Sequence, residues 1–442
     1  MITWLLGDYI TQIPTCKEVF LVLGKKLEYN IRKKAGEHMI IGIIGAGASG
    51  MAAALAASEN EKARVLLFER QARVGRKLLA TGNGRCNLTN LHAMERGYHG
   101  DDPDFAAAAL KAMDPKATLA WFAQLGLYTV AEDSGRVYPY SDQANSVVDV
   151  LRFALQRPNI TLYTGAEVTK VHYRDGSFTV QTEQDSYVCD RLIIACGGLA
   201  GTKLGGTMMG YRLLRSLGHS ATRLRPALVQ LKSGWHGTAA LKGIRANCHA
   251  RILRDGQLYS ESTGEIQFTE YGISGPVVFE ISRDVCQSAG KWECVLDLAP
   301  ELGNDQLIRM ISQRTYAQIT AEDLLTGILH NRLGRVIVQA AGIQLQKSAK
   351  DVSSQEVEAI VNMIKNFCLE LTEPLGMDSA QVTAGGIKTG EFCPDTMESR
   401  LVPGLYACGE VLDIDGDCGG YNLQWAWSSG RAAGLHAGEV TV

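Results

Sequence analysis

Two glycine-rich segments, one near each end of the chain, have the composition of a nucleotide-binding site. The first reads Gly45-Ala-Gly-Ala-Ser-Gly50, and the second runs from Gly404 through Glu410 to Asn422. Glycine leaves backbone N–H groups bare, and a loop that opens a helix places them at the positive end of the helix dipole, which favours phosphate. Together the two segments predict one dinucleotide site built from both ends of the chain.

The elements around the first segment are those of a dinucleotide-binding βαβ unit. An apolar strand, Ile40–Ile44, precedes the glycines, an alanine-rich helix follows over Met51–Ala57, and a second strand covers Ala63–Phe68. That strand leads to Glu69, which lies 19 residues past Gly50. A spacing of about 20 is expected for an acid that bonds a ribose hydroxyl. This context favours a genuine fingerprint over a chance glycine triplet.

Each glycine of the motif has its own task. Gly45 permits the tight turn, Gly47 lets the backbone approach the pyrophosphate, and Gly50 lets the helix touch the strand. Another glycine-rich segment, Gly205–Gly210, does not have the glycine spacing of this motif, and we interpret it as a loop that enters a helix.

The sequence favours FAD over a nicotinamide as the bound dinucleotide. Glu69 fits the ribose of either cofactor. The segment Arg73–Lys77 adds glycine and cations where a second phosphate contact would fall, and the C-terminal block has no role in a simple NAD domain. We therefore expect bound FAD, with NAD(P)H left open as a transient electron donor.

A polar loop over residues 83–90 is a further candidate for cofactor contact. Asn83, Arg85, Asn87 and Asn90 could donate to the flavin ring and phosphates, although the same residues could simply cap the next helix. We expect Cys86 to pack as a small residue beside the flavin, since no histidine lies near it in sequence to form a thiolate.

Composition excludes several classes of protein. The chain has 442 residues, so two or three domains are expected. Its net charge of −3 predicts no overall attraction to nucleic acid or anionic lipid. It has neither a run of 18 apolar residues nor a signal peptide, so no membrane partner is expected. Eleven cysteines without C-x-x-C spacing indicate reduced thiols in the cytoplasm and argue against disulfide-reductase chemistry.

The pattern of apolar residues predicts a discontinuous nucleotide-binding domain. Alternating segments over 160–188 predict a β-meander, and those over 227–297 a small barrel or sheet; helical spacing appears over 303–314, 321–339 and 353–367. The expected division is an appendage at 1–38, the first part of the FAD-binding domain at 39–225, a β-rich insert at 226–300, a helical subdomain at 301–375, and the second part of the FAD-binding domain at 376–442.

Several longer motifs resemble those of one family. Gly75–Asn90, Gly135–Asp142, Thr269–Pro276, Thr383–Gly386 and the block Gly404–Gly434 are similar to the signatures of the BaiN-like NAD(P)/FAD-dependent oxidoreductases, also called aminoacetone oxidase family FAD-binding enzymes. The resemblance covers nearly everything from Met39 onward. It implies an α/β fold, namely a Rossmann-like two-dinucleotide-binding-type FAD fold with an inserted β-barrel-like domain and a helical subdomain.

The catalytic residue is not identified by these motifs. Tyr138, Glu270 and Tyr271 are candidates for acid–base work, and each could equally be structural. Asp413, Asp415 and Asp417 alternate like calcium ligands, but the terminal glutamate of an EF-hand loop is missing, so we expect loop polarity and no metal. Of Trp425 and Trp427, at most one should line a cavity, because they lie two apart on a helix.

The resulting hypothesis is an FAD-dependent oxidoreductase that passes hydride through flavin N5 to or from a small molecule. The alternatives are a reductase that saturates a base in ribosomal RNA, for which cations between Lys203 and Arg245 would form a basic face, and a flavoprotein without turnover. The oligomeric state stays open. The predicted cofactor-binding residues are Gly45, Gly47, Ala48, Ser49, Gly50, Glu69, Arg70, Arg76, Lys77, Asn83, Arg85, Cys86, Asn87, Val168, Gly197, Gly198, Gly409, Glu410, Gly420, Tyr421, Asn422 and Leu423.

Overall fold

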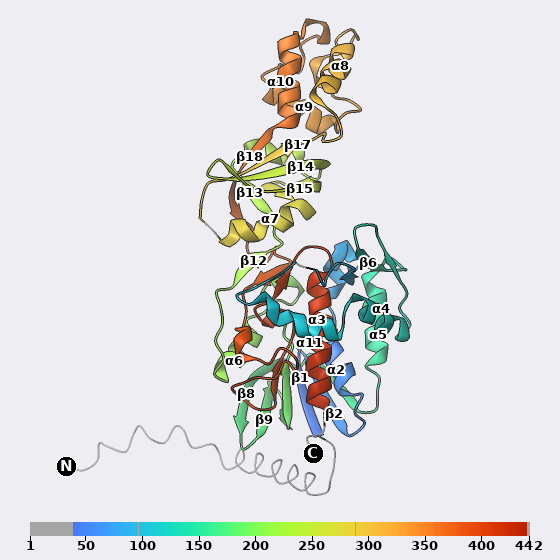
Figure 1. Ribbon diagram of the computed structural model, residues 1–442, viewed down its shortest axis with the longest axis vertical. Coiled ribbons are helices and arrows are strands. Elements are labelled where there is room, and N and C mark those ends of the chain that lie inside the picture. Colours follow the sequence, from blue (N-terminus) through green and yellow to red (C-terminus); the bar gives the residue numbers. More distant parts are fainter. Residues whose placement is uncertain (1–38, 96, 288, 440–442) are drawn as a thin grey trace, which may run out of the picture.

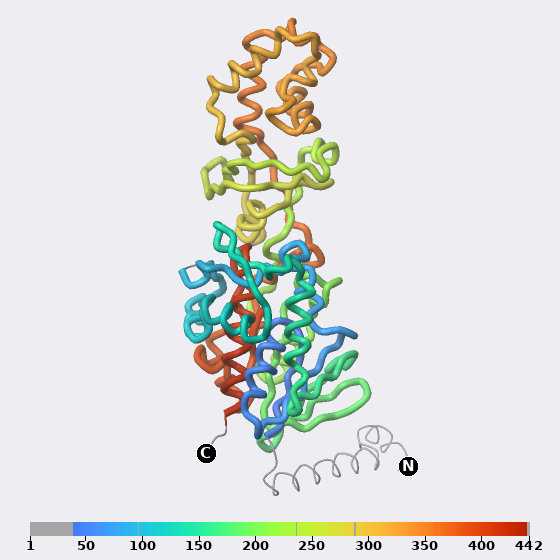
Figure 2. The backbone as a smooth tube through the Cα atoms, turned by 90° about the vertical axis from the view of Figure 1, so that its right-hand side faces the viewer, coloured from blue at the N-terminus to red at the C-terminus, as the bar shows by residue number. Residues whose placement is uncertain are grey.

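A computed structural model describes residues 39–95, 97–287 and 289–439. The nucleotide-binding domain, a β-barrel and a cluster of helices are stacked along one axis (Figures 1 and 2). The expected appendage at 1–38 lies outside the described residues. None of the helices among the described residues combines the length and the apolar composition of a membrane span.

The core of the nucleotide-binding domain is a parallel sheet of five strands in the order β20-β11-β1-β2-β7. Its strands are short and apolar, as expected for a sheet with both faces covered. Their bounds are β1 Met39–Ile44, β2 Ala63–Glu69, β7 Ile160–Thr164, β11 Arg191–Ile194 and β20 Leu405–Ala407. The strand over 160–164, which we had expected in the meander, instead forms the edge of this sheet beside β2.

Two helices far apart in sequence pack closely over this sheet. They are α2 (Ala48–Ala57) and α11 (Tyr421–Gly438), which run side by side in Figure 1. Gly430 and Gly434 of α11 face the backbone of α2, where an added Cβ would overlap the carbonyl oxygens of Ser49 and Ala53. The small residues of both helices therefore permit a backbone contact that joins the two ends of the chain.

The remaining elements of this domain support the edges of the site. The meander consists of β8 (Val168–Arg174), β9 (Ser177–Thr182) and β10 (Ser186–Cys189). One small sheet has the strand order β3 (Thr89–Asn90), β6 (Arg136–Pro139) and β5 (Thr129–Ala131). A second small sheet consists of β21 (Asp415–Gly416) and β4 (Tyr98–His99). The helices are α3 Ala106–Ala112, α4 Pro115–Gln124, α5 Ala144–Ala154 and α6 Met209–Ser216.

The insert is joined to the nucleotide-binding domain through a pair of antiparallel strands. β12 (Arg225–Ala227) leads into the insert and pairs with β19 (Val382–Ala384), which leads out of it. Between them the chain forms a closed barrel in the order β13-β16-β15-β14-β17-β18. The bounds are β13 Leu231–Ser233, β14 Arg245–Arg254, β15 Gln257–Phe268, β16 Gly272–Ser274, β17 Trp292–Asp297 and β18 Phe367–Pro374, with α7 at Pro276–Gln287.

The helical cluster at the far end consists of α8 (Asn304–Arg314), α9 (Asn331–Ala340) and α10 (Ser354–Lys365). The helix expected over 321–339 is shorter than predicted, because a 3-10 turn at Ala321–Asp323 and a loop precede α9. Strand β18 lies inside the segment that we had expected to be helical, and it closes the barrel by pairing with β13 and β17. The barrel and the helical cluster share one hydrophobic core. The domain boundaries that we proposed at residues 225, 300 and 375 stay predictions.

Candidate functional site

A cavity of about 650 Å³ extends from the glycine motif of β1–α2 to the underside of the barrel. Its lining comes from the nucleotide-binding domain and from the insert, including residues of β15, β16 and α7. Figure 1 shows α7 on the side of the barrel that faces the nucleotide-binding domain. A ligand in this cavity would therefore contact both domains.

The three glycines of the motif have the geometry that their predicted tasks require. Gly45 has a φ of +103°, and an added Cβ would approach the backbone of Ala195. A Cβ on Gly50 would overlap the carbonyl oxygen of Gly45. A Cβ on Gly47, in contrast, meets no atom within 4 Å, although Gly47 lines the cavity. Of these three glycines, only Gly47 is at a position where a side chain would occupy space that a ligand could use.

Glu69 ends β2 and fixes the glycine loop. Its Oε2 accepts a hydrogen bond from the backbone N–H of Ala46 at 2.9 Å, and its Oε1 accepts from Gln71 at 2.8 Å. Next to it, Arg70 donates to the carbonyl oxygen of Gly205 at 2.9 Å. Glu69 and Arg70 both line the cavity, where a ligand could reach them. The contact between Glu69 and a ribose hydroxyl stays a prediction.

The loop over residues 82–87 forms another wall. Gly82 and Asn83 both have positive φ, and a Cβ on Gly82 would approach the backbone N of Asn87. Arg85 pairs with Asp142 and Glu132 and stacks on the ring of Tyr138, so its charge is already used within the protein. This arrangement favours a structural role for the Arg85 charge over the phosphate contact that we had expected, although Arg85 lines the cavity.

Asn87 is the residue of this loop that most plainly requires a ligand. It is buried, it lines the cavity, and its Oδ1 has no hydrogen-bond partner among the described residues. A buried amide oxygen without a partner is costly, since it has lost its water and gained nothing in return. An N–H donor of a bound flavin ring would satisfy it.

Cys86 lies behind the cavity wall and does not line it. The side chain is fully buried, and burial raises the pKa of the thiol to about 12. The thiol is therefore protonated at neutral pH and packed in the interior, and its place beside the flavin stays a prediction.

Glu410 joins three segments of the cavity wall. Its Oε2 lies 2.7 Å from Lys77 Nζ, and its Oε1 accepts from the backbone N–H of Thr383 at 2.9 Å. Gly198 lies so close that a Cβ there would collide with the Glu410 carboxylate. Lys77, Gly198 and Glu410 all line the cavity, so the ion pair could still orient a bound ribityl chain.

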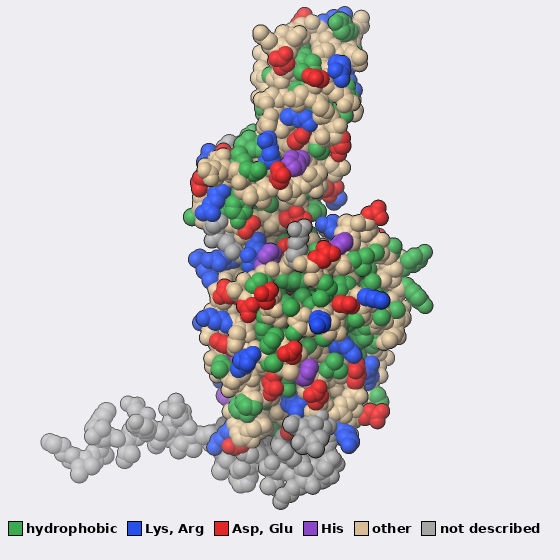
Figure 3. Space-filling view, viewed as in Figure 1, with side chains coloured by type: hydrophobic (Ala, Val, Ile, Leu, Met, Phe, Trp, Pro, Cys, Tyr) green, Lys and Arg blue, Asp and Glu red, His purple; other side chains and the backbone are tan. Residues whose placement is uncertain are grey.

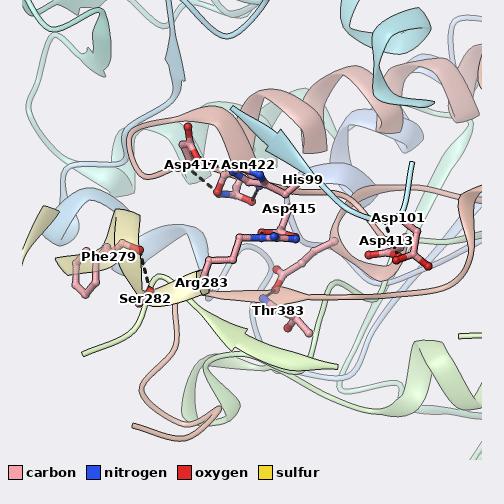
Figure 4. A network of polar contacts seen from close by, with 12 residues as sticks. His99, Asp101, Phe279, Ser282, Arg283, Thr383, Asp413, Asp415, Asp417 and Asn422 are labelled. Atoms are coloured by element: carbon pink, nitrogen blue, oxygen red, sulfur yellow. Dashed lines mark hydrogen bonds and ion pairs between the residues drawn. The ribbon is translucent and has the colours of Figure 1, made fainter. Parts of the chain in front are cut away.

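The acidic loop before α11 is held by three different contacts rather than one shared ligand. Asp413 Oδ2 accepts from the Asp101 N–H at 3.3 Å, and Asp417 Oδ1 lies 2.7 Å from His99 Nε2. Asp415 pairs with Arg283 of α7 (Figure 4). Burial raises the pKa of the Asp413 carboxyl. The three aspartates therefore contact different groups of the protein.

The helix α11 begins at Tyr421, directly after Gly419 and Gly420, both of which have positive φ. A Cβ on Gly420 would overlap the backbone of Thr89. Asn422 holds the preceding turn by bonding to the backbone of Gly416 on both its N–H and its C=O. The positive end of α11 therefore opens onto the cavity, which Gly420, Asn422 and Leu423 line.

The two tryptophans of α11 point to different environments, as predicted from their spacing. Trp425 lines the cavity, and its Nε1 donates to the carbonyl oxygen of Gly409 at 3.2 Å. Trp427 packs edge-on against Phe122, and its Nε1 donates to Leu88.

Most of the predicted cofactor-binding residues come together in this one cavity. Those that line it are Gly45, Gly47, Ala48, Ser49, Glu69, Arg70, Arg76, Lys77, Asn83, Arg85, Asn87, Val168, Gly197, Gly198, Glu410, Gly420, Asn422 and Leu423. Gly50, Cys86, Gly409 and Tyr421 lie in the layer behind it. Contact of each residue with the cofactor stays a prediction.

Of the acid–base candidates, only Tyr138 lines the cavity. Its hydroxyl pKa is raised by burial. Tyr271 is exposed, and Glu270 pairs with Lys242 on the surface of the barrel. Neither Tyr271 nor Glu270 lines the cavity.

Sequence reasoning missed the contribution of the insert to the cavity. Gln230, Gln267, Ser274 and Phe279 line it from the barrel side, as do residues 378–382, which lead into β19. The motif Thr269–Pro276 was the available signal, because it contains β16 and the start of α7. Cys418 also lines the cavity, and burial raises the pKa of its thiol to about 11.

The residues present fit FAD. The unpartnered Asn87 oxygen, the free space beside Gly47 and the helix N-termini of α2 and α11 all face one cavity. Gly47, Ala48 and Ser49 would hold the pyrophosphate, Glu69 the adenosine ribose, and Asn87 with the start of α11 the flavin ring.

Comparison with known proteins places the chain in a known family. Residues 39–436 match the family described as the HI0933-like protein Rossmann domain. A 3-dehydro-bile acid delta(4,6)-reductase of Clostridium scindens is 42% identical over 407 residues, which covers 90% of this chain and 99% of the relative. A ribosomal RNA dihydrouridine synthase of Escherichia coli is 30% identical over 393 residues, which covers 88% of this chain and 96% of the relative.

Among solved structures, a 3-ketosteroid delta1-dehydrogenase of Sterolibacterium denitrificans aligns with a TM-score of 0.48 and 13% identity, over 90% of this chain and 99% of that one. The family match and the relatives identify the chain as a member of the HI0933-like Rossmann family, whose BaiN-like members are FAD-dependent oxidoreductases.

Proposed function

We propose that this protein reduces a carbon–carbon double bond conjugated with a carbonyl group in a small molecule, with NAD(P)H as electron donor and hydride passing through flavin N5. The observation that carries the proposal is the continuity of the cavity from Gly47 and Asn87 to Gln267 and Ser274 of the barrel. A cofactor held at the first end leaves the second end for an acceptor.

The names of the relatives support this reaction class. One relative is a delta(4,6)-reductase of a 3-dehydro-bile acid, and the other is a dihydrouridine synthase. Each name, taken in its chemical meaning, denotes saturation of a carbon–carbon double bond near a carbonyl group. The two substrates differ greatly in size and polarity, so the shared element is the bond and not the molecule.

The protein's own residues have three tasks in this proposal. The glycine loop and Glu69 bind the nucleotide half of FAD, and bound FAD supplies reversible two-electron chemistry. The Lys77–Glu410 pair, with its 2.7 Å contact, fixes the wall beside the cofactor. The barrel, through Gln230, Gln267 and Phe279, covers the reacting centre and excludes water.

The test is direct. The purified protein is mixed anaerobically with NADH or NADPH, and the loss of the visible flavin absorbance is followed. The reduced protein is then mixed with 2-cyclohexen-1-one, and the ketone product is identified by mass. Reoxidation with formation of cyclohexanone supports the proposal. No reoxidation by this enone or by a larger dienone would contradict it.

A second candidate is a base in ribosomal RNA, and one observation favours it. Residues 191–254 contain eleven Lys and Arg and no Asp or Glu. Five of these cations, Lys203, Arg212, Arg215, Arg223 and Arg225, form no ion pair with any described residue. An unpaired group of cations could bind phosphates of an RNA backbone.

Against this candidate, Figure 3 shows acidic side chains among the basic ones on the viewed face of the nucleotide-binding domain. Incubation of the reduced protein with ribosomal RNA, followed by digestion and mass analysis of nucleosides, would separate the two substrates. A gain of two hydrogens on one uridine would favour RNA.

We place the reaction in the cytoplasm, where the ten free cysteines of the described chain would stay reduced.

A further inference from the structure

The turn from β16 to α7 brings a short polar segment of the insert to the cavity. The segment is Ser274-Gly-Pro276, and all three residues line the cavity. Ser274 ends β16 on the barrel wall, and Pro276 begins α7, a helix of 12 residues. The turn therefore places the N-terminal end of α7 against the space that faces the nucleotide-binding domain.

The residue types of this segment are those that the turn requires. Gly275 has a φ of +107°, and an added Cβ would lie 2.8 Å from the carbonyl oxygen of Glu265, so no larger residue fits. Proline suits the first position of a helix, because its fixed φ is already helical and its missing N–H would be unbonded there. The positive end of the α7 dipole is thus held in a fixed place.

Ser274 adds a hydroxyl that has no partner. Its side chain is 5% exposed, and its Oγ makes no hydrogen bond with any described residue. A hydroxyl that lines a cavity and has no protein partner is a donor available to a ligand. The Ser274 hydroxyl is a separate feature from the N-terminal end of α7, and both face the same cavity.

We propose that Ser274 and the N-terminal end of α7 bind the carbonyl oxygen of the acceptor and stabilise the negative charge that forms on it. The inference rests on the proposed function. Hydride added at the β carbon brings two electrons, the π electrons of the double bond move toward the carbonyl, and the oxygen becomes an enolate oxygen. A proton added at the α carbon then completes the saturated ketone, so NAD(P)H and one proton are consumed for each double bond.

This arrangement divides the positive helix ends between the two domains. α2 and α11 belong to the nucleotide-binding domain, where their ends serve the cofactor, whereas α7 belongs to the insert. The insert therefore contributes the group that activates the acceptor. A donor aimed at an oxygen that gains charge lowers the barrier, because the charge is stronger in the transition state than in the ground state.

The test uses 4-nitrophenolate, whose negative oxygen on a conjugated ring resembles an enolate, with the FAD-loaded full-length protein. Binding is followed through the difference spectrum of the flavin and the phenolate. We expect the wild type to bind the probe. Ser274→Ala should raise the dissociation constant of the probe by roughly 10- to 100-fold, as expected when a hydrogen bond to a charged group is lost. Ser274→Thr, which keeps the hydroxyl, should restore most of the affinity.

Ser260→Ala is the matched control. Ser260 lies on strand β15 of the same barrel, and its Oγ also has no partner, but it does not line the cavity. This variant should bind the probe like the wild type. A wild type that does not bind 4-nitrophenolate, or a Ser274→Ala variant that binds it equally well, would overturn the assignment.

Failure of the proposed function would look different. If no enone is reduced while probe binding still depends on Ser274, the anion site stands and the reaction class is wrong. If Ser274→Ala slows flavin reduction by NAD(P)H and leaves probe binding unchanged, the hydroxyl serves the electron donor and the assignment to the acceptor is wrong.

Discussion

Arg283 of the insert and Asp415 of the nucleotide-binding domain form a bidentate ion pair. Arg283 Nε lies 2.9 Å from Oδ2 of Asp415, and Nη2 lies 3.2 Å from Oδ1 (Figure 4). The Asp415 side chain is 2% exposed and that of Arg283 is 19% exposed. The pair connects α7, whose first residues line the cavity, to the loop that leads into α11.

The first prediction concerns this ion pair. Arg283→Ala would leave a buried carboxylate without its cation, and breaking such a pair typically costs about 3–5 kcal/mol. We expect the free energy of unfolding, measured with denaturant, to fall by that amount, and FAD to dissociate at lower denaturant concentration. Arg152→Ala is the control, because its pair with Asp149 is exposed and should contribute less than about 1 kcal/mol. Equal effects of the two variants would show that the Arg283 pair does not hold the domains together.

The second prediction tests the cofactor cradle. Gly47→Leu should abolish FAD binding without unfolding the protein, since the new side chain would extend into the cavity and not into the packed interior. Gly303→Leu is a matched control: Gly303 is also a helix N-cap with an extended backbone and no atom within 4 Å of an added Cβ, but it lies at α8 in the helical cluster. Flavin absorbance of the purified variants decides the matter. A fully yellow Gly47→Leu protein would refute the fingerprint.

The third prediction concerns pH. The ring of His219 is buried between Glu391, with Nδ1 2.8 Å from Oε2, and Ser399, with Nε2 3.0 Å from Oγ. Burial lowers the pKa of His219 from its ordinary value of 6.5, despite the opposing effect of Glu391. The unfolded chain therefore binds the proton more tightly, so this contribution to stability is present above pH 6.5 and is lost as the pH falls through the lower folded value.

The same site has a second titrating group with the same sign. Burial alone would raise the pKa of Glu391, but hydrogen bonds from Ser220 and His219 outweigh burial and lower it. As the pH falls below 6.5 the wild type should lose stability, as measured by denaturant unfolding at each pH. His219→Gln should show a smaller slope below that pH. An equal slope would mean that other groups cause the acid sensitivity.

The βαβ unit and the C-terminal helix were predictable because their signals are local. The apolar strands around Gly45, the alanines of α2 and the glycines before Tyr421 each restrict the backbone within a few residues. Strand β18 was not predictable in this way. Its residues follow α10 directly, and only pairing with β13 and β17, far away in sequence, makes them part of the barrel.

The same reasoning explains which site residues were missed. Ser274 and Gln267 are ordinary barrel residues by sequence, and they reach the cavity only because β12 pairs with β19 and thereby sets the insert over the nucleotide-binding domain. The ion pairs of Arg85 could not be predicted for a related reason: its partners Asp142 and Glu132 lie on other segments of the chain, and only the fold brings them to Arg85.

The fourth prediction concerns thiol reactivity. Burial would raise the pKa of Cys393, but hydrogen bonds from Thr396 and Asp395 outweigh it and lower the pKa. Cys86 and Cys418 have raised values because they are buried. Iodoacetamide at neutral pH should therefore modify Cys393 first among the described cysteines, as read by peptide mass analysis. Early modification of Cys86 would mean that its loop opens in solution.

The fifth prediction concerns the contact between α11 and α2. Gly430, Gly434 and Gly438 follow one another at intervals of four along α11, so they lie on one face. An added Cβ would overlap the Ser49 and Ala53 carbonyl oxygens at the first two positions, but at Gly438 it would lie 3.1 Å from that of Ala57. Alanine favours a helix interior over glycine by up to about 1 kcal/mol.

These two effects compete, and the outcome should differ along the helix. Gly430→Ala and Gly434→Ala should lower the free energy of unfolding by about 1–3 kcal/mol, because the packed backbones must separate. Gly438→Ala should have the smallest effect of the three, since the neighbouring backbone needs to shift only slightly. Gly430→Ala should also weaken FAD binding more than Gly434→Ala does, because Ser49 lines the cavity and Ala53 does not. Equal flavin affinity in these two variants would show that the α2 N-terminus is held in place by β1 and not by α11.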